Sequence, residues 1–181
     1  MIKNSSNNYG TVAKALHWSI ALLIFTLFAV GIYMTGLTDN DPSRSTIYGL
    51  HKASGTLVIV LSLFRLLWVV ISPPPAAPAA LAKVDRIIHK SVVGLLYLLI
   101  LAVPLAGFFM SQFFGYGVDF FGAFEIPVIV GKNEEIAEFF EQSHELLAFI
   151  IIGLAALHML GALKHRLKDR NGETDVLKRM L

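Results

Sequence analysis

The 181-residue sequence contains no cysteine and few charged residues. Without cysteine the chain cannot form disulfides, bind an iron–sulfur cluster through thiolates or attach a haem covalently through a C-x-x-C-H motif. Charged residues make up 15% of the chain, against about 25% in an average soluble domain, while hydrophobic residues make up 55%. This composition excludes an ordinary soluble domain and indicates a membrane protein.

Long hydrophobic stretches recur four times, and each approaches or exceeds the roughly 20 residues that a helix needs to cross a bilayer. They cover approximately residues 15–37, 48–71, 87–110 and 143–163. Lipid offers no hydrogen-bond partners to the backbone, so each stretch is expected to be helical. The sequence predicts an all-α membrane protein: a single domain over residues 1–181 that is a four-transmembrane-helix bundle, with an amphipathic tail over residues 164–181 resting on the membrane.

Basic residues predict the orientation of this bundle. Four spans place both termini on one side, and 12 of the 15 lysines and arginines lie at or near that side. Only Arg44, Lys52 and Lys132 lie at the other. Because Lys and Arg accumulate in cytoplasmic loops, both termini are expected to be cytoplasmic. The N-terminal segment has no A-x-A-like cleavage site, so we interpret the first stretch as a retained helix.

Four histidines lie within the hydrophobic stretches, where ionisable residues are costly and are commonly functional. His144 and His158 are 14 residues apart in the last stretch, so they leave the same helix face about 21 Å apart along the axis. His17 opens the first stretch at the inner side and therefore pairs with His158. His51 opens the second stretch at the outer side and pairs with His144. Each pair is predicted to ligate the iron of one non-covalent haem b, giving two haems stacked along the membrane normal.

Two glycines and two basic residues lie near the depths predicted for the two haems. Gly31, on the His17 face, and Gly55, one turn beyond His51, remove bulk where a porphyrin would approach the backbone, although small residues also serve helix packing. Arg65, at the inner depth, is a candidate for pairing with a haem propionate or holding a quinone oxygen. Lys52 is the outer candidate. Snorkelling to the headgroups is the alternative for Arg65.

Two further histidines lie at the cytoplasmic side. His165 is two turns beyond His158 on nearly the same face, where it can donate to a quinone carbonyl or relay its proton. A headgroup-level histidine in a basic tail is the alternative. His89 is a weaker candidate for the quinone site and is the fallback ligand in place of His17.

Several motifs together resemble the bacterial cytochrome b561 family. They are LHWSIA around His17, LHKASG and FRLLWVVISPPP in the second stretch, SHELLAFIIIGLAALH in the fourth and LKHRLKD after it. The resemblance implies a bundle in the bacterial inner membrane that holds two b haems on the same four histidines and exchanges electrons with the quinone pool, with ubiquinone as the expected substrate. His165 matches a position linked to the family's quinone site. Family members often have a histidine four residues before the tyrosine matched by Tyr97, where this chain has Val93.

The leading hypothesis is a dihaem b-type cytochrome that transfers electrons across the inner membrane between the quinone pool and a periplasmic donor or acceptor. Some members similar to this chain resemble superoxide oxidases, so a superoxide:ubiquinone oxidoreductase is the alternative. The outer segments carry nine acidic and three basic residues, a net charge of about −6, which opposes superoxide and suits a basic redox protein or a neutral small-molecule donor. A haem-bearing membrane anchor of a dehydrogenase or hydrogenase, and a non-redox metal or proton transporter, stay open. Membrane lipid and quinone are the expected partners, and no nucleic acid is expected.

Overall fold

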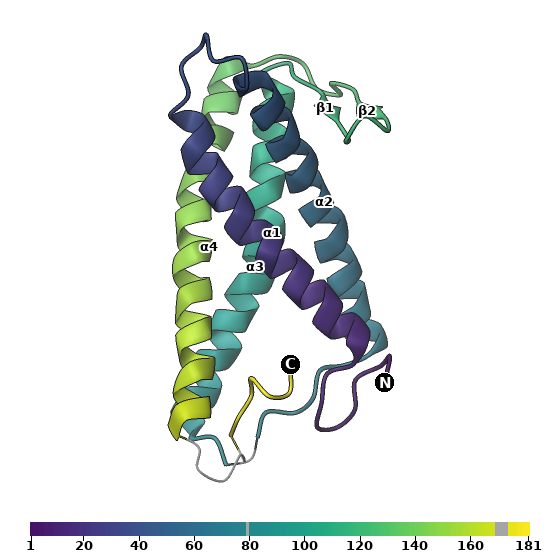
Figure 1. The fold of residues 1–181 in the computed structure, drawn as a ribbon, viewed down its shortest axis with the longest axis vertical. Coiled ribbons are helices and arrows are strands. Elements are labelled where there is room, and N and C mark those ends of the chain that lie inside the picture. The colour runs from purple at the N-terminus through teal and green to yellow at the C-terminus, as the bar shows by residue number, and fades with distance from the viewer. Residues whose placement is uncertain (79, 169–173) are drawn as a thin grey trace.

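Four long helices build the protein, as a computed structural model of residues 1–78, 80–168 and 174–181 shows (Figure 1). They are α1 (Thr11–Thr35), α2 (Arg44–Ile71), α3 (Lys83–Phe113) and α4 (Glu134–Lys168). Each is long and apolar enough to cross a membrane. Both termini lie at the same end of the bundle, which we call the terminal end. The predicted all-α bundle of four membrane-spanning helices is confirmed.

The connection between α3 and α4 contains a small antiparallel hairpin made of β1 (Val118–Asp119) and β2 (Glu125–Ile126). The hairpin lies at the end of the bundle opposite the termini, which we call the hairpin end (Figure 1). Sequence reasoning did not anticipate these strands, because each has only two residues and neither shows an alternating pattern long enough to detect.

The helices extend beyond the predicted hydrophobic stretches. The first begins at Thr11, four residues early, and the last begins at Glu134, nine residues early. Hydrophobicity marks only the lipid-embedded part of a helix, whereas backbone hydrogen bonding continues into the headgroup region. The predicted tail over residues 164–181 does not form one separate segment. Its first residues continue α4 to Lys168, and residues 169–173 lie outside the described part of the chain.

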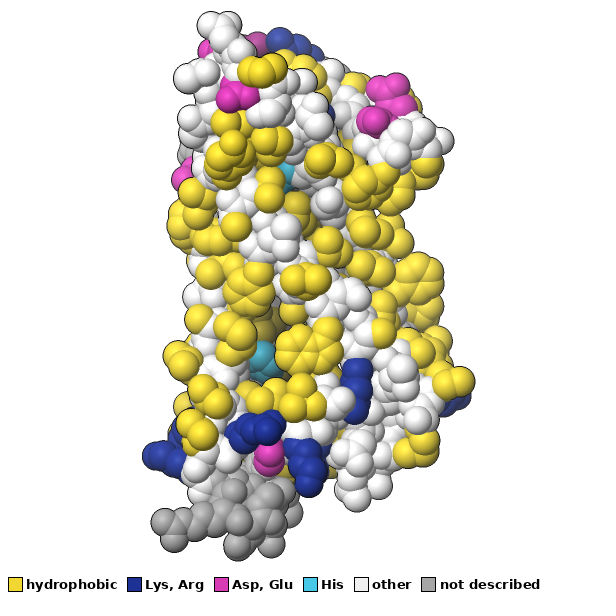
Figure 2. Space-filling view, in the orientation of Figure 1, with side chains coloured by type: hydrophobic (Ala, Val, Ile, Leu, Met, Phe, Trp, Pro, Cys, Tyr) yellow, Lys and Arg dark blue, Asp and Glu magenta, His cyan; other side chains and the backbone are white. Residues whose placement is uncertain are grey.

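The helices pack in sequence order, with α1 against α2, α2 against α3, and α3 against α4, while α4 approaches α1 only sparsely. A small core of Ile20, Leu99, Ile100 and Ile151 joins α1, α3 and α4. Hydrophobic side chains cover the flank of the bundle, whereas acidic side chains gather at the hairpin end and basic ones near the terminal end (Figure 2). An apolar flank between two charged ends is the surface expected of a chain surrounded by lipid.

The last residues of the chain fold back against its first half. The indole Nε1 of Trp18 on α1 donates to the carbonyl oxygen of Met180 at 3.0 Å. A guanidinium nitrogen of Arg179 donates to the carbonyl oxygen of Ala76, in the α2–α3 connection, at 2.8 Å. These hydrogen bonds hold residues 174–181 beneath the terminal end of the bundle.

Candidate functional site: two histidine pairs

The structure brings the four predicted histidines together as two pairs. The ring centres of His17 and His158 lie 6.4 Å apart. Those of His51 and His144 lie 6.2 Å apart. A metal ion about 2.0 Å from one nitrogen of each of two opposed imidazoles would place the ring centres about 6 Å apart. Both separations therefore fit two rings that share one metal ion.

Each pair joins two helices whose backbones otherwise have few contacts. His158 and His144 both lie on α4, while their partners lie on α1 and α2. Among the described residues α4 packs extensively on α3, sparsely on α1 and less still on α2. Histidine side chains are visible at two heights between the hydrophobic side chains of the flank (Figure 2). Rings that meet between separated helices suit a flat ligand better than a compact protein-only metal site.

The pair nearer the hairpin end is fixed from α3. The Nδ1 atom of His144 lies 2.9 Å from the carbonyl oxygen of Val103 and donates to it when that nitrogen carries the proton. This tautomer leaves Nε2 free to bind a metal. A Cβ atom at Gly107 would lie only 2.9 Å from Nδ1 of the same ring, so glycine is needed for this close approach. Across the pair, Nδ1 of His51 is buried and has no hydrogen-bond partner within the described chain.

The two glycines proposed from the sequence have different surroundings. A Cβ at Gly31 would lie 3.5 Å from Cε1 of His51, an ordinary van der Waals contact. Nothing in the described chain lies within 4 Å of a Cβ at Gly55. The glycine in closest contact with a histidine ring is Gly107, whose contact the sequence did not reveal, because it depends on how α3 and α4 pack.

A third histidine flanks the pair nearer the terminal end. The ring centre of His89, on α3, lies 6.2 Å from that of His158, about as close as that of His17. The ring distances alone therefore do not show whether His17 or His89 is the partner of His158. The helix packing differs between them, since α3 packs extensively on α4 while α1 approaches α4 only sparsely. A macrocycle is more easily accommodated between two sparsely packed helices, which favours the predicted His17 as the partner of His158.

Arg65 lies in a polar cluster next to this pair. Its guanidinium carbon sits 5.4 Å from the ring centre of Tyr97, and no described carboxylate lies within ion-pair distance of it. Together with Tyr9, Trp68 and Met180 these residues line a small pocket at the terminal end. The indole nitrogen of Trp68 is buried without a hydrogen-bond partner in the described chain. A half-buried cation without an acidic partner there suits an anionic or carbonyl oxygen of a ligand.

His165 and Lys52 both have partners within the protein. Nε2 of His165 lies 3.9 Å from a carboxylate oxygen of Asp85 on α3, and the other oxygen accepts from Lys164 at 2.8 Å. The sequence analysis did not single out Asp85, which precedes the third hydrophobic stretch. Lys52 donates to the carbonyl oxygen of Gly117 at 3.0 Å and so ties α2 to the segment before the hairpin. The interaction of Lys52 with a haem stays a prediction.

Comparison with known proteins gives consistent matches over almost the whole chain. A family model described as prokaryotic cytochrome b561 matches residues 8–181. The chain is 33% identical to cytochrome b561 homolog 2 of Escherichia coli (strain K12) over 178 residues, covering 98% of this chain and 93% of that protein. It is 29% identical to cytochrome b561 homolog 1 of the same strain over 170 residues, covering 88% and 90%. It is 27% identical to a protein of Yersinia pestis named probable superoxide oxidase CybB over 166 residues, covering 89% and 91%.

Proposed function

Because the chain belongs to the prokaryotic cytochrome b561 family, and is thus a multi-pass membrane protein of electron transfer that binds haem b, we propose that it holds two haems and conducts electrons between the two faces of the membrane. Haem b supplies one-electron redox chemistry at its iron. The observation that carries the proposal is the pair of imidazole separations, 6.4 and 6.2 Å, at two heights of one bundle.

The residues present fit two bis-histidine sites. His17 and His158 would hold the iron nearer the terminal end, and His51 and His144 the iron nearer the hairpin end. The buried, unpartnered Nδ1 of His51 and the open space beside Gly55 are the chain's own signs of a missing neighbour. Two histidines on each iron would leave no position for oxygen or substrate, which suits electron transfer. A non-redox metal or proton transporter stays the alternative of a different class, and it predicts a purified protein without haem.

We place quinone exchange at the terminal end. The Arg65 cluster and the His165–Asp85 pair both lie there, close to the pair formed by His17 and His158. A guanidinium can donate to a quinone oxygen, and an imidazole held by a carboxylate can carry the proton that accompanies reduction. His89 remains the weaker quinone candidate. Val93, where family members often have histidine, offers no donor, so these groups would have to supply the hydrogen bonds instead.

The distribution of charged side chains between the two ends of the bundle supports the proposed orientation in the membrane. Basic side chains gather near the terminal end and acidic ones at the hairpin end (Figure 2). Basic termini favour a cytoplasmic location in the bacterial inner membrane, with the hairpin end in the periplasm. An acidic periplasmic face attracts a basic redox protein or tolerates a neutral donor, and it repels superoxide. The similarity to a probable superoxide oxidase still makes superoxide:quinone oxidoreductase the second candidate. Superoxide-dependent quinone reduction by purified protein separates the two.

The test is haem stoichiometry in single-histidine variants, measured with optical spectra and a pyridine haemochrome assay. We expect two low-spin b haems per wild-type chain. His17→Leu and His158→Leu should lose one haem, and His51→Leu and His144→Leu should lose the other. His89→Leu is the matched control and should keep both. Loss of a haem in His89→Leu but not in His17→Leu would reassign the inner ligand, and a colourless wild-type protein would refute the proposal.

A further inference from the structure

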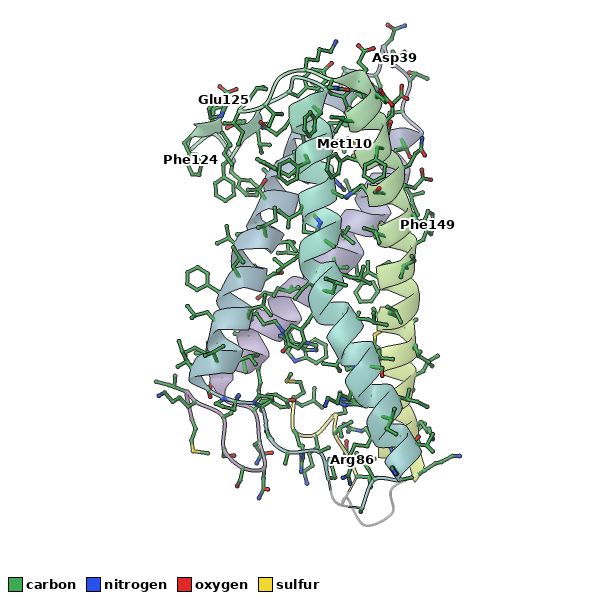
Figure 3. The ribbon with its side chains drawn as sticks, turned by 180° about the vertical axis from the view of Figure 1, so that it is seen from behind. Asp39, Arg86, Met110, Phe124, Glu125 and Phe149 are labelled. Atoms are coloured by element: carbon green, nitrogen blue, oxygen red, sulfur yellow. The ribbon has the colours of Figure 1, made fainter. Side chains whose placement is uncertain are left out.

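The hairpin between α3 and α4 extends sideways from the bundle and overhangs the outer flank of α2. Figures 1 and 3 show it from opposite sides, and in both views it lies beyond α2 instead of covering the end of the bundle. Along its length α2 exposes large apolar side chains, including Leu50, Leu63 and Phe64, and Leu50 also lines the space between α2 and the hairpin. In a membrane-spanning chain this flank faces lipid, so the hairpin lies over the lipid next to the protein and not over another helix.

Aromatic rings form the tip of this hairpin and are exposed. Phe124 is 56% exposed and Phe121 49%. Phe120 supports both, since its ring centre lies 5.0 Å from that of each neighbour. Three adjoining phenylalanines on an exposed turn are unfavourable in water, because rings of this size normally gain their stabilisation from burial.

Acidic and aromatic side chains occupy opposite sides of the hairpin. In Figure 3 Glu125 points toward the hairpin end of the molecule, while Phe124 lies on the side nearer the middle of the bundle. In Figure 2 acidic side chains sit on the outer side of the hairpin, and hydrophobic ones on its inner side continue into the apolar flank. The charged side therefore faces water and the aromatic side faces the depth at which lipid begins.

Phe121, in the turn of the hairpin, has a backbone conformation that normally favours other residue types. Phe121 has φ 54° and Gly122 has φ 74°, and the N–H of Ala123 donates to the carbonyl oxygen of Phe120. Positive φ at both central residues defines a type I′ turn, which strongly prefers Asn, Asp or Gly at the position of Phe121. A bulky residue in a left-handed conformation points to a use for its ring.

A groove runs between the hairpin and α2. Ser45, Thr46 and Asp119 are polar residues of its lining, and Leu50, Ala53 and Phe121 are apolar ones. On α2 the polar pair precedes the apolar pair and so lies nearer the hairpin end. This order, polar toward the hairpin end and apolar toward the bundle middle, is the order of headgroup and acyl chain in a leaflet.

We propose that the hairpin is an interfacial anchor whose partner is the phospholipid leaflet at the hairpin end. The rings of Phe121 and Phe124 enter the boundary between headgroups and acyl chains. The backbone stays among the headgroups, because two-residue strands leave edge N–H and C=O groups that need water. The inference rests on the membrane-spanning fold alone and is independent of haem content or quinone chemistry.

The absence of cysteine from the chain allows a clean test. A fluorophore is attached to Ala123→Cys, which leaves both rings intact, and the full-length protein is reconstituted in phosphatidylcholine vesicles. Nitroxide lipids labelled at the headgroup or at carbon 5 or 12 of the acyl chain then report depth. We expect quenching by the headgroup and carbon-5 nitroxides and little by carbon 12. Asn40→Cys, in the α1–α2 loop at the same end, should stay unquenched.

A matched variant tests whether the rings cause insertion. In Ala123→Cys with Phe121→Ser and Phe124→Ser, quenching should fall to the level of Asn40→Cys, while the optical spectrum of the protein stays unchanged. Quenching of the Ala123→Cys label no stronger than that of Asn40→Cys, or quenching that persists after both rings are removed, would overturn the proposal.

Discussion

The hydroxyl of Ser62 on α2 donates a 3.3 Å hydrogen bond to the carbonyl oxygen of Ile100 on α3. In an uninterrupted helix that carbonyl would accept from the backbone N–H of residue 104, but residue 104 is proline and has no N–H. Ser62 is 0% exposed, so water cannot replace either partner. One side chain thus satisfies the backbone group that Pro104 leaves free and fastens α2 to α3 in the middle of the bundle.

Replacing Ser62 with alanine should lower the free energy of unfolding by about 1–3 kcal/mol, because the carbonyl of Ile100 loses its partner in apolar surroundings. Thermal or denaturant unfolding in detergent measures the change. Pro104→Ala restores an N–H at the same place, so Ser62→Ala should cost much less in a Pro104→Ala background. The exposed Ser45→Ala is the control. Equal costs in both backgrounds would show that the hydroxyl acts by another route.

Gly107→Ala tests the close approach of α3 to the histidine pair near the hairpin end. The added Cβ would lie 2.9 Å from the imidazole of His144 and should push that ring away from His51. We expect haem content to fall toward about one per chain, since displaced ligands lose metal affinity. Gly94→Ala on the same helix, where a Cβ meets nothing within 4 Å, should retain both haems. Full haem occupancy in both variants would show that the ring tolerates the displacement.

The spans could be predicted from sequence because their length is set by membrane thickness. The pairing of the histidines was likewise accessible, because the 14-residue spacing of His144 and His158 fixes their depths on one helix. The roles of Gly107 and Val103 could not be predicted, since their contacts with His144 depend on the rotation and register of α3 against α4. The hairpin escaped notice because its strands have only two residues each and its turn places Phe121, and not Asn or Gly, at a positive φ.

Asp85→Asn tests the carboxylate that holds His165 at the terminal end. The substitution removes the negative charge that lies 3.9 Å from the imidazole and should release the ring. We expect quinol-driven reduction of the haems to slow by about tenfold while haem content stays unchanged, because only the positioning of a proton carrier is lost. Lys164→Met removes the other partner of Asp85 and is the control. Equal rates in Asp85→Asn and wild type would show that this carboxylate does not position a proton carrier for the quinone reaction.

Tyr9 links the two ends of the chain, and its ionisation should weaken the packing at this contact. Its backbone N–H donates to the carbonyl oxygen of Arg179 at 3.3 Å. Burial raises the pKa of the Tyr9 hydroxyl above its ordinary value of 10.0; the nearby Tyr97 adds to the rise, while Arg65 and Arg179 oppose it. The folded state therefore holds the phenolic proton more tightly than the unfolded state does. The resulting stabilisation is complete below about pH 10 and falls as the pH rises through the higher folded-state pKa.

Alkaline titration should therefore weaken the packing around Tyr9, where the N-terminal segment meets residues 174–181. The fluorescence of Trp18 reports this change, because its indole donates to the carbonyl oxygen of Met180. In Tyr9→Phe no proton can be lost at this position, so the fluorescence change should move to higher pH or disappear. Tyr33→Phe removes an exposed tyrosine at the other end of α1 and should leave the transition in place. An unchanged alkaline transition in Tyr9→Phe would mean that a different group causes it.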